Sequence, residues 1–100
     1  MQRTDQRRIL IVDDEPGLRE LVRINLEHEG FAVLQAENGV QGLEMIQEEH
    51  PDLVILDVMM PEMDGWEVCK RLREFSQVPV LMLTARAQSQ DLVTGLESGA

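Results

Sequence analysis

The stretch DLVILDVMMPEMDG, residues 52–65, decides the fold. Four apolar residues, Leu53–Leu56, run without a break into Asp57, and the chain then reaches a proline and a turn at Asp64-Gly65. A short apolar run bounded by turn residues predicts a strand buried on both faces, as in parallel sheets. Because a charge at the mouth of a buried strand is costly, Asp57 is a candidate functional residue.

Three further apolar runs predict strands at Ile9–Val12, Phe31–Leu34 and Val78–Leu83. Each segment between consecutive runs has the length and the apolar periodicity of one helix. The periodic residues are Leu18, Leu21, Val22 and Leu26 in the first segment, Val40, Leu43 and Ile46 in the second, and Val68, Leu72 and Phe75 in the third. Regular alternation of strands and helices predicts an α/β fold, with a parallel sheet covered on both faces.

Turn and cap residues support these boundaries. Pro16 suits the first turn of a helix, and Gly30 suits a C-terminal cap. Asn38-Gly39 and Pro51-Asp52 flank the second helix. We also expect a fourth helix between Ser89 and Gly99, with Leu92, Val93 and Leu96 on its apolar face.

Composition favours one domain over residues 1–100, with residues 1–8 as a polar N-terminal extension. The chain has 43% hydrophobic and 28% charged residues, which suits a small soluble domain. Its formal net charge of −10 argues against nucleic-acid binding through this chain. The apolar runs are too short to span a bilayer, and a single cysteine, Cys69, allows no internal disulfide. We therefore expect a cytoplasmic protein that does not insert into membranes.

Polar residues follow three of the predicted strands. Asp13 and Asp14 end the first, Asp57 ends the third, and Thr84 ends the fourth. The carboxyl ends of parallel strands share one rim, where open α/β sheets bind ligands, so these side chains are expected to lie together. Three close carboxylates raise each other's pKa values unless a cation lies among them.

Mg²⁺ is the cation that this set of ligands suits. It prefers oxygen ligands and commonly shares its shell with a phosphate oxygen, while zinc is disfavoured because no Cys or His accompanies the carboxylates. With the metal present, one carboxylate can attack phosphorus to give an aspartyl phosphate. The Thr84 hydroxyl could then donate a hydrogen bond to the phosphoryl oxygens.

Each candidate also has an ordinary structural explanation. Asp13 and Asp14 could cap the following helix, and Asp57 or Thr84 alone could be plain strand-end residues. The remaining singular residues are better explained by structure: Cys69 as an inert core thiol, His28 and His50 at helix C-termini, and Met59, Met60 and Met63 in rim packing. For Trp66, an exposed partner contact and packing on the third helix both stay open.

Three motifs, ILIVDDE, DLVILDVMMPEMDG and VPVLMLTA, resemble the receiver domain of bacterial two-component response regulators, in order and over Ile9 to Ala100. The resemblance implies a flavodoxin-like fold with strand order 2-1-3-4. It implies a phosphoacceptor signalling domain, not an enzyme, that receives a phosphoryl group from a histidine kinase.

The resemblance also assigns roles. Asp57 would be the phosphoacceptor, and Asp13 and Asp14 would organise Mg²⁺, with Asp57 and the backbone carbonyl of Met59 completing the protein ligands. Thr84 would be the switch hydroxyl. Ala85 would be the small residue that leaves room for the phosphoryl group.

The chain departs from the family pattern after the GLESGA motif. Family members continue into a fifth strand with a Lys-Pro pair and a fifth helix, so we expect a receiver domain truncated before both. The lysine normally pairs with the phosphoryl group, so its absence puts the phosphorylation switch in question. The exposed edge of the strand at Val80–Leu83 would then be open to pairing in a homodimer.

Two alternatives belong to other classes. One is a phosphatase that uses Asp57 as nucleophile, although no general acid or substrate cap is evident. The other is a truncated interaction or dimerisation module whose carboxylate cluster is only structural.

Overall fold

The computed structural model describes residues 6–83 of the protein. Thr84, Ala85 and the predicted fourth helix lie outside the described residues. Within the described part, strands and helices alternate from β1 to β4, as the apolar runs predicted.

Four parallel strands form one sheet in the order β2-β1-β3-β4. The strands are β1 (Arg8–Val12), β2 (Ala32–Ala36), β3 (Leu53–Asp57) and β4 (Val80–Leu83). This order confirms the predicted fold class and places β1 and β3 at the centre. The chain reverses direction across the sheet between β2 and β3, which makes the carboxyl ends of β1 and β3 the switch point of the topology.

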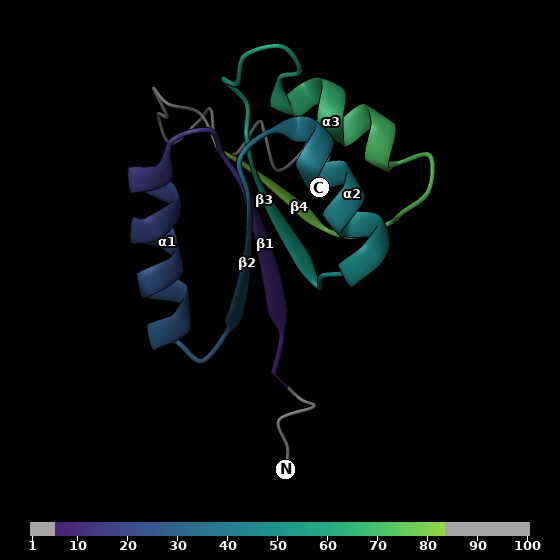
Figure 1. Ribbon diagram of the computed structural model, residues 1–100. Helices are drawn as coiled ribbons and strands as arrows, with labels where there is room; N and C mark the ends of the chain where they lie inside the picture. Colours follow the sequence, from purple (N-terminus) through teal and green to yellow (C-terminus); the bar gives the residue numbers. More distant parts are fainter. Residues whose placement is uncertain (1–5, 84–100) are drawn as a thin grey trace.

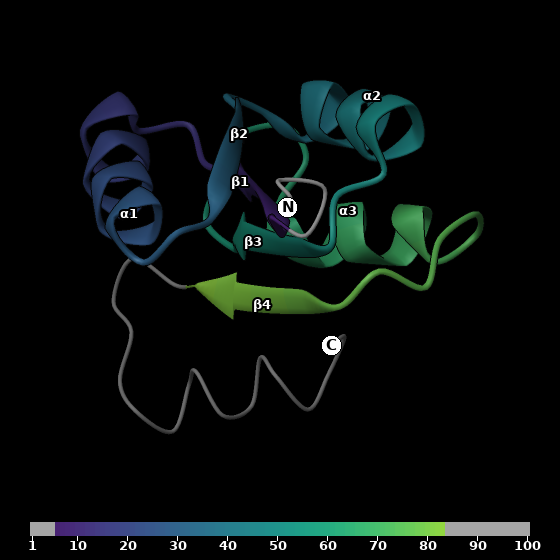
Figure 2. The same ribbon diagram turned by 90° about the horizontal axis from the view of Figure 1, so that it is seen from below.

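Three helices connect the strands: α1 (Pro16–His28), α2 (Gly39–Glu49) and α3 (Gly65–Leu72). Figures 1 and 2 show α1 on one face of the sheet and α2 with α3 on the other. Of these three helices, none has the combination of length and apolar character needed to cross a bilayer.

The larger core lies between the sheet and the α2–α3 face. Leu10, Val54 and Leu56 project into it from the central strands, and Val68 and Leu72 meet them from α3, all five fully buried. Burial of a side chain of this size stabilises a fold by about 1.5–3 kcal/mol relative to leaving it exposed. The α1 face is thinner, since no residue of α1 is fully buried.

The start of α2, the start of α3 and the end of α1 lie at the predicted turn and cap residues. The side chains of Asn38 and Asp64 accept hydrogen bonds from the Gln41 and Glu67 N–H groups, at 2.8 and 2.9 Å, and so begin α2 and α3. Gly30 has a φ of 99° just beyond α1, a backbone conformation that a glycine adopts without strain.

Three predicted strand starts were wrong. β1 begins at Arg8, one residue earlier than predicted, and two other strands begin later for a local reason. Phe31 donates its N–H to the Leu26 carbonyl at 3.1 Å as part of the α1 cap, so β2 begins at Ala32. Val78 donates its N–H to the Ser76 hydroxyl at 3.1 Å and accepts from Arg73 through its carbonyl at 2.7 Å. Both backbone groups of Val78 are therefore used locally, and Pro79 has no N–H to donate to a neighbouring strand. β4 accordingly begins at Val80.

Some residues of the predicted apolar faces are exposed. Leu21 is 57% exposed on α1 and Val40 is 55% exposed at the start of α2. Phe75, 43% exposed, lies beyond the end of α3. The helical periodicity was therefore predicted correctly, although it overestimated the width of the buried face.

Candidate functional site

Three carboxylates meet at the rim where β1 and β3 end. One carboxylate oxygen from each of Asp13, Asp14 and Asp57 lies within 4.8 Å of the others. Asp13 is 1% exposed and Asp57 6%, whereas Asp14 faces solvent. The parallel topology thus brings together the acidic residues that the sequence placed at two separate strand ends.

Asp13 is held by its neighbours on two sides. Its N–H donates to the Ala36 carbonyl at 3.1 Å, and its Oδ1 accepts from the Glu15 N–H at 2.8 Å. Oδ2 is buried, and no group among residues 6–83 donates a hydrogen bond to it. A buried carboxylate oxygen without a donor is destabilising unless a cation or water satisfies it, so this atom points to a ligand.

The capping explanation for the acidic pair does not fit this geometry. The N-cap of α1 is Glu15, and its side chain makes no capping hydrogen bond. Asp13 instead receives the Glu15 N–H in a tight turn before the helix begins. The pair therefore lines the rim and leaves the cap position to Glu15.

Asp57 is buried at the end of β3. Burial, with smaller contributions from the charges of Asp13, Asp14 and Glu15, raises the pKa of its carboxyl to about 6, and a hydrogen bond from the Met59 N–H at 3.0 Å acts in the opposite direction. The pKa of Asp13 is also raised, chiefly by burial. The sequence predicted raised pKa values for these acids from their mutual repulsion, but burial is the larger cause. Both acids would ionise more readily with a cation beside them.

The sequence did not reveal one polar neighbour of the site. Arg19, on the first turns of α1, donates through Nη1 to the Asp13 backbone carbonyl at 2.6 Å and through Nε to the Gln35 side chain at 3.2 Å. A contact to a backbone carbonyl leaves no complementary side chain to recognise in a sequence. Arg19 could have been found only by placing it on the sheet-facing side of α1.

The cysteine, the two histidines and most of the methionines near Asp57 have the structural roles predicted for them. Cys69 is buried in the core, His28 is the last residue of α1, and His50 is the C-cap of α2. Among the methionines that follow Asp57, Met60 is buried and Met63 packs against the core, as predicted for rim packing. The exception is Met59, which is 50% exposed.

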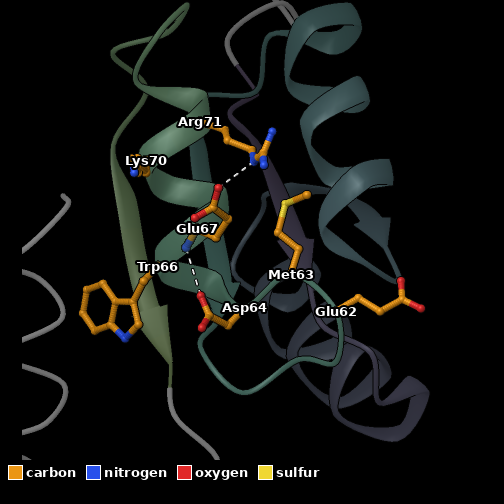
Figure 3. Close-up of a pocket in the computed structure, with 7 residues that line it drawn as sticks. All are labelled: Glu62, Met63, Asp64, Trp66, Glu67, Lys70 and Arg71. Atoms are coloured by element: carbon orange, nitrogen blue, oxygen red, sulfur yellow. Dashed lines mark hydrogen bonds and ion pairs between the residues drawn. The ribbon is translucent and has the colours of Figure 1, made fainter.

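A shallow hollow lies along α3, apart from the carboxylates. Figure 3 shows Trp66 and Lys70 on one side of α3 and the paired Glu67 and Arg71 facing the Met63 side chain. The hollow has a volume of about 530 Å³ and contains none of the three rim carboxylates. Trp66 is 41% exposed, so it is a partly exposed surface residue of α3.

The sequence matches the family described as response regulator receiver domain over residues 9–100. Among similar curated proteins, the transcriptional regulatory protein CseB of Streptomyces coelicolor is 48% identical over 96 residues, which are 96% of this chain and 41% of CseB. The DNA-binding response regulator MtrA of Mycolicibacterium smegmatis is 50% identical over 97 residues, which are 97% of this chain and 42% of MtrA. The chain thus spans about two fifths of the length of these relatives.

Solved structures agree with this assignment. The chemotaxis protein CheY4 of Vibrio cholerae superposes with a TM-score of 0.81 at 33% identity, covering 95% of this chain and 82% of that one. The BeF3-activated N-terminal receiver domain of RstA from Klebsiella pneumoniae gives a TM-score of 0.80 at 34% identity, covering 93% and 80%. Sequence motifs, strand order and rim carboxylates lead to the same result, and the chain belongs to the response regulator receiver domain family.

Proposed function

We propose that Asp57 accepts a phosphoryl group with the help of Mg²⁺ held at the carboxylate rim. Receiver domains are signalling phosphoacceptor modules, and this chain is one of them. The observation that carries the residue assignment is the convergence of Asp13, Asp14 and Asp57 around the buried, unpartnered Oδ2 of Asp13.

The residues at the rim fit a magnesium ion. Asp13, Asp14 and Asp57 would supply carboxylate oxygens, and the backbone carbonyl of Met59 would be a further ligand. Hard oxygen donors on a partly open rim leave room for the waters that Mg²⁺ retains. When bound, the ion neutralises charge between the carboxylates and the incoming phosphate.

The chemistry that we assign to the chain is a nucleophilic displacement at phosphorus. A carboxylate oxygen of Asp57 forms a bond to phosphorus, while the bond from phosphorus to the donor atom breaks and its electron pair leaves with the donor. The reaction needs Asp57 ionised. Since burial raises its pKa to about 6, Asp57 is mostly ionised at neutral pH even without the metal.

We propose a histidine kinase as the physiological donor, because this is the partner of receiver domains in two-component signalling. Thr84 is proposed to donate its hydroxyl to the phosphoryl oxygens, and Ala85 to leave space beside them. Both residues follow β4 directly in the sequence, and the last residue of β4, Leu83, pairs with Asp57 of β3 in the sheet.

The test is the intact mass of the protein after incubation with Mg²⁺ and acetyl phosphate. We expect one added phosphoryl group on the unmodified chain, none on Asp57→Asn, and none when the metal is chelated. Asp64→Asn is the matched control, because Asn caps a helix as well as Asp does and Asp64 lies outside the carboxylate cluster. Absence of the adduct, or its persistence in Asp57→Asn, would contradict the proposal.

Two predictions from the sequence keep their own tests. Pairing of the β4 edge across a homodimer stays a prediction, and a compact, cooperatively folding monomer at high concentration in sedimentation would contradict it. Steady turnover of a generic phosphoester would instead favour the phosphatase alternative.

A further inference from the structure

We propose that Arg19 is a positioning residue of the carboxylate rim, which fixes Asp13 so that its free oxygen faces the metal position. The inference rests on the proposed function, because it concerns how the chain holds Mg²⁺. Arg19 touches none of the reacting groups and acts through Asp13.

The geometry gives Arg19 two anchors. Its Nη1 donates to the carbonyl of Asp13 at 2.6 Å, and its Nε donates to Oε1 of Gln35 at 3.2 Å. Gln35 belongs to β2 and Asp13 follows β1, so one guanidinium connects α1, the loop before it and the neighbouring strand. The planar guanidinium donates in fixed directions, which an ammonium cannot reproduce.

With Arg19 included, three polar groups of Asp13 are engaged. Ala36 accepts from its N–H, Arg19 donates to its carbonyl, and Glu15 donates to Oδ1. Oδ2 is left, and it is buried without a partner in the described part of the chain. The backbone and one carboxylate oxygen are thus fixed, so the direction of Oδ2 is determined before any cation arrives. Such support of a ligating carboxylate is worth about 10- to 100-fold in metal affinity in known metal sites.

The support of Asp13 by Arg19 raises the affinity for Mg²⁺, whereas the positive charge of Arg19 lowers it. A positive guanidinium near the rim repels Mg²⁺, so removing the charge alone would tighten Mg²⁺ binding. Removing the support to Asp13 would weaken it. The two contributions therefore differ in sign, and the sign of the change in affinity identifies the role of Arg19.

The experiment is a Mg²⁺ titration of the 100-residue chain followed by amide NMR. The Glu15 and Met59 amides are the reporters, because they donate to the carboxylates of Asp13 and Asp57. We expect Arg19→Gln to weaken Mg²⁺ binding about tenfold. Arg19→Lys keeps the repelling charge but cannot reproduce both hydrogen bonds, so it should weaken Mg²⁺ binding at least as much as Arg19→Gln. An unchanged or tighter affinity in Arg19→Gln would overturn the inference.

Arg23→Gln is the matched control, because Arg23 lies on the same helix and, in the described part of the chain, pairs with Glu20 and Glu27 on α1. Its Mg²⁺ affinity should equal that of the unmodified chain. Should Arg19→Gln fail to fold, Gln35→Ala removes one of the two anchors and is expected to weaken Mg²⁺ binding about threefold. Unchanged binding in Gln35→Ala would then overturn the inference.

The two proposals fail in different ways. If the unmodified chain binds Mg²⁺ and Asp13→Asn does not, the metal site stands, and the Arg19 variants test the inference alone. If Asp13→Asn binds Mg²⁺ as tightly as the unmodified chain, the proposed metal site and the role of Arg19 are both refuted.

Discussion

Asp57 is a carboxylate that its surroundings make hard to ionise. It is 6% exposed at the end of β3, with two other acids beside it and, within residues 6–83, one backbone N–H donating to it. The same burial that keeps water from the carboxylate also disfavours its charge. The residue proposed to react is therefore also a source of instability in the metal-free protein.

The first prediction concerns the pH dependence of this instability. The pKa of Asp57 is about 6 in the folded protein, against an ordinary value of 3.8. Above pH 6 the folded state holds an ionised Asp57 at a cost, whereas below about pH 4 the acid is neutral in both states. The stability from this residue is thus present at low pH and lost as the pH rises through 6.

Asp57→Asn removes this titration. Without Mg²⁺ we expect the variant to be more stable than the unmodified chain at pH 7, by on the order of 2 kcal/mol, with the difference shrinking towards zero as the pH falls below 4. Urea denaturation across that pH range measures it. A difference that stays constant with pH would show that the burial of Asp57 does not act through its charge.

At the scale of elements, the β3–α3 connection determines how closely the helix approaches Asp57. Gly65, the first residue of α3, donates its N–H to the Val58 carbonyl at 3.0 Å. A Cβ built on Gly65 would lie 2.5 Å from the Asp57 carbonyl oxygen and 2.8 Å from the Val58 Cα. Both neighbours are backbone atoms, so the contact cannot be relieved by a change of rotamer.

The second prediction compares two glycines at helix starts. Gly65→Ala should destabilise the protein by about 2 kcal/mol or more, because β3 and α3 must separate to admit the methyl group. Gly17→Ala near the start of α1 is the control: a Cβ there meets nothing within 4 Å, so alanine should be neutral or stabilising by about 0.5 kcal/mol. Chemical denaturation measures both. Equal effects of the two substitutions would show that the close approach at Gly65 carries no energetic weight.

At the scale of the whole molecule, the sheet connects the proposed metal binding to folding. The three acids come from two strand ends that meet only when β1 and β3 pair. The unfolded chain has no such cluster, so a cation that binds it stabilises the folded state alone.

The third prediction is that Mg²⁺ raises the stability of the protein by about 2.7 kcal/mol at a concentration of 100 times its dissociation constant. The gain should disappear on chelation and in Asp13→Asn. Thermal unfolding in buffers of matched ionic strength measures it, since added salt also screens the repulsion among the acids. A gain of equal size in Asp13→Asn would place the bound ions elsewhere on this acidic chain.

The sequence by itself determined the parallel α/β fold, the strand order through its family resemblance, and the acidic residues of the site. Apolar runs and helical periodicity are local signals, and two of the strand ends were marked by acids, such as Asp57 after Leu53–Leu56. The rule that parallel strands share one carboxyl rim then predicted that Asp13 and Asp57 meet.

Only the tertiary structure decided the start of β2, the exposure of Leu21 and the support of Asp13 by Arg19. In each case the deciding partner is a backbone group or a packing distance, and neither has a signature in the order of residues. The pKa of Asp57 belongs to the same class, because its largest cause is burial by segments far apart in the chain. Local chemistry was therefore readable from the sequence, whereas the fold supplied the contacts that position and tune it.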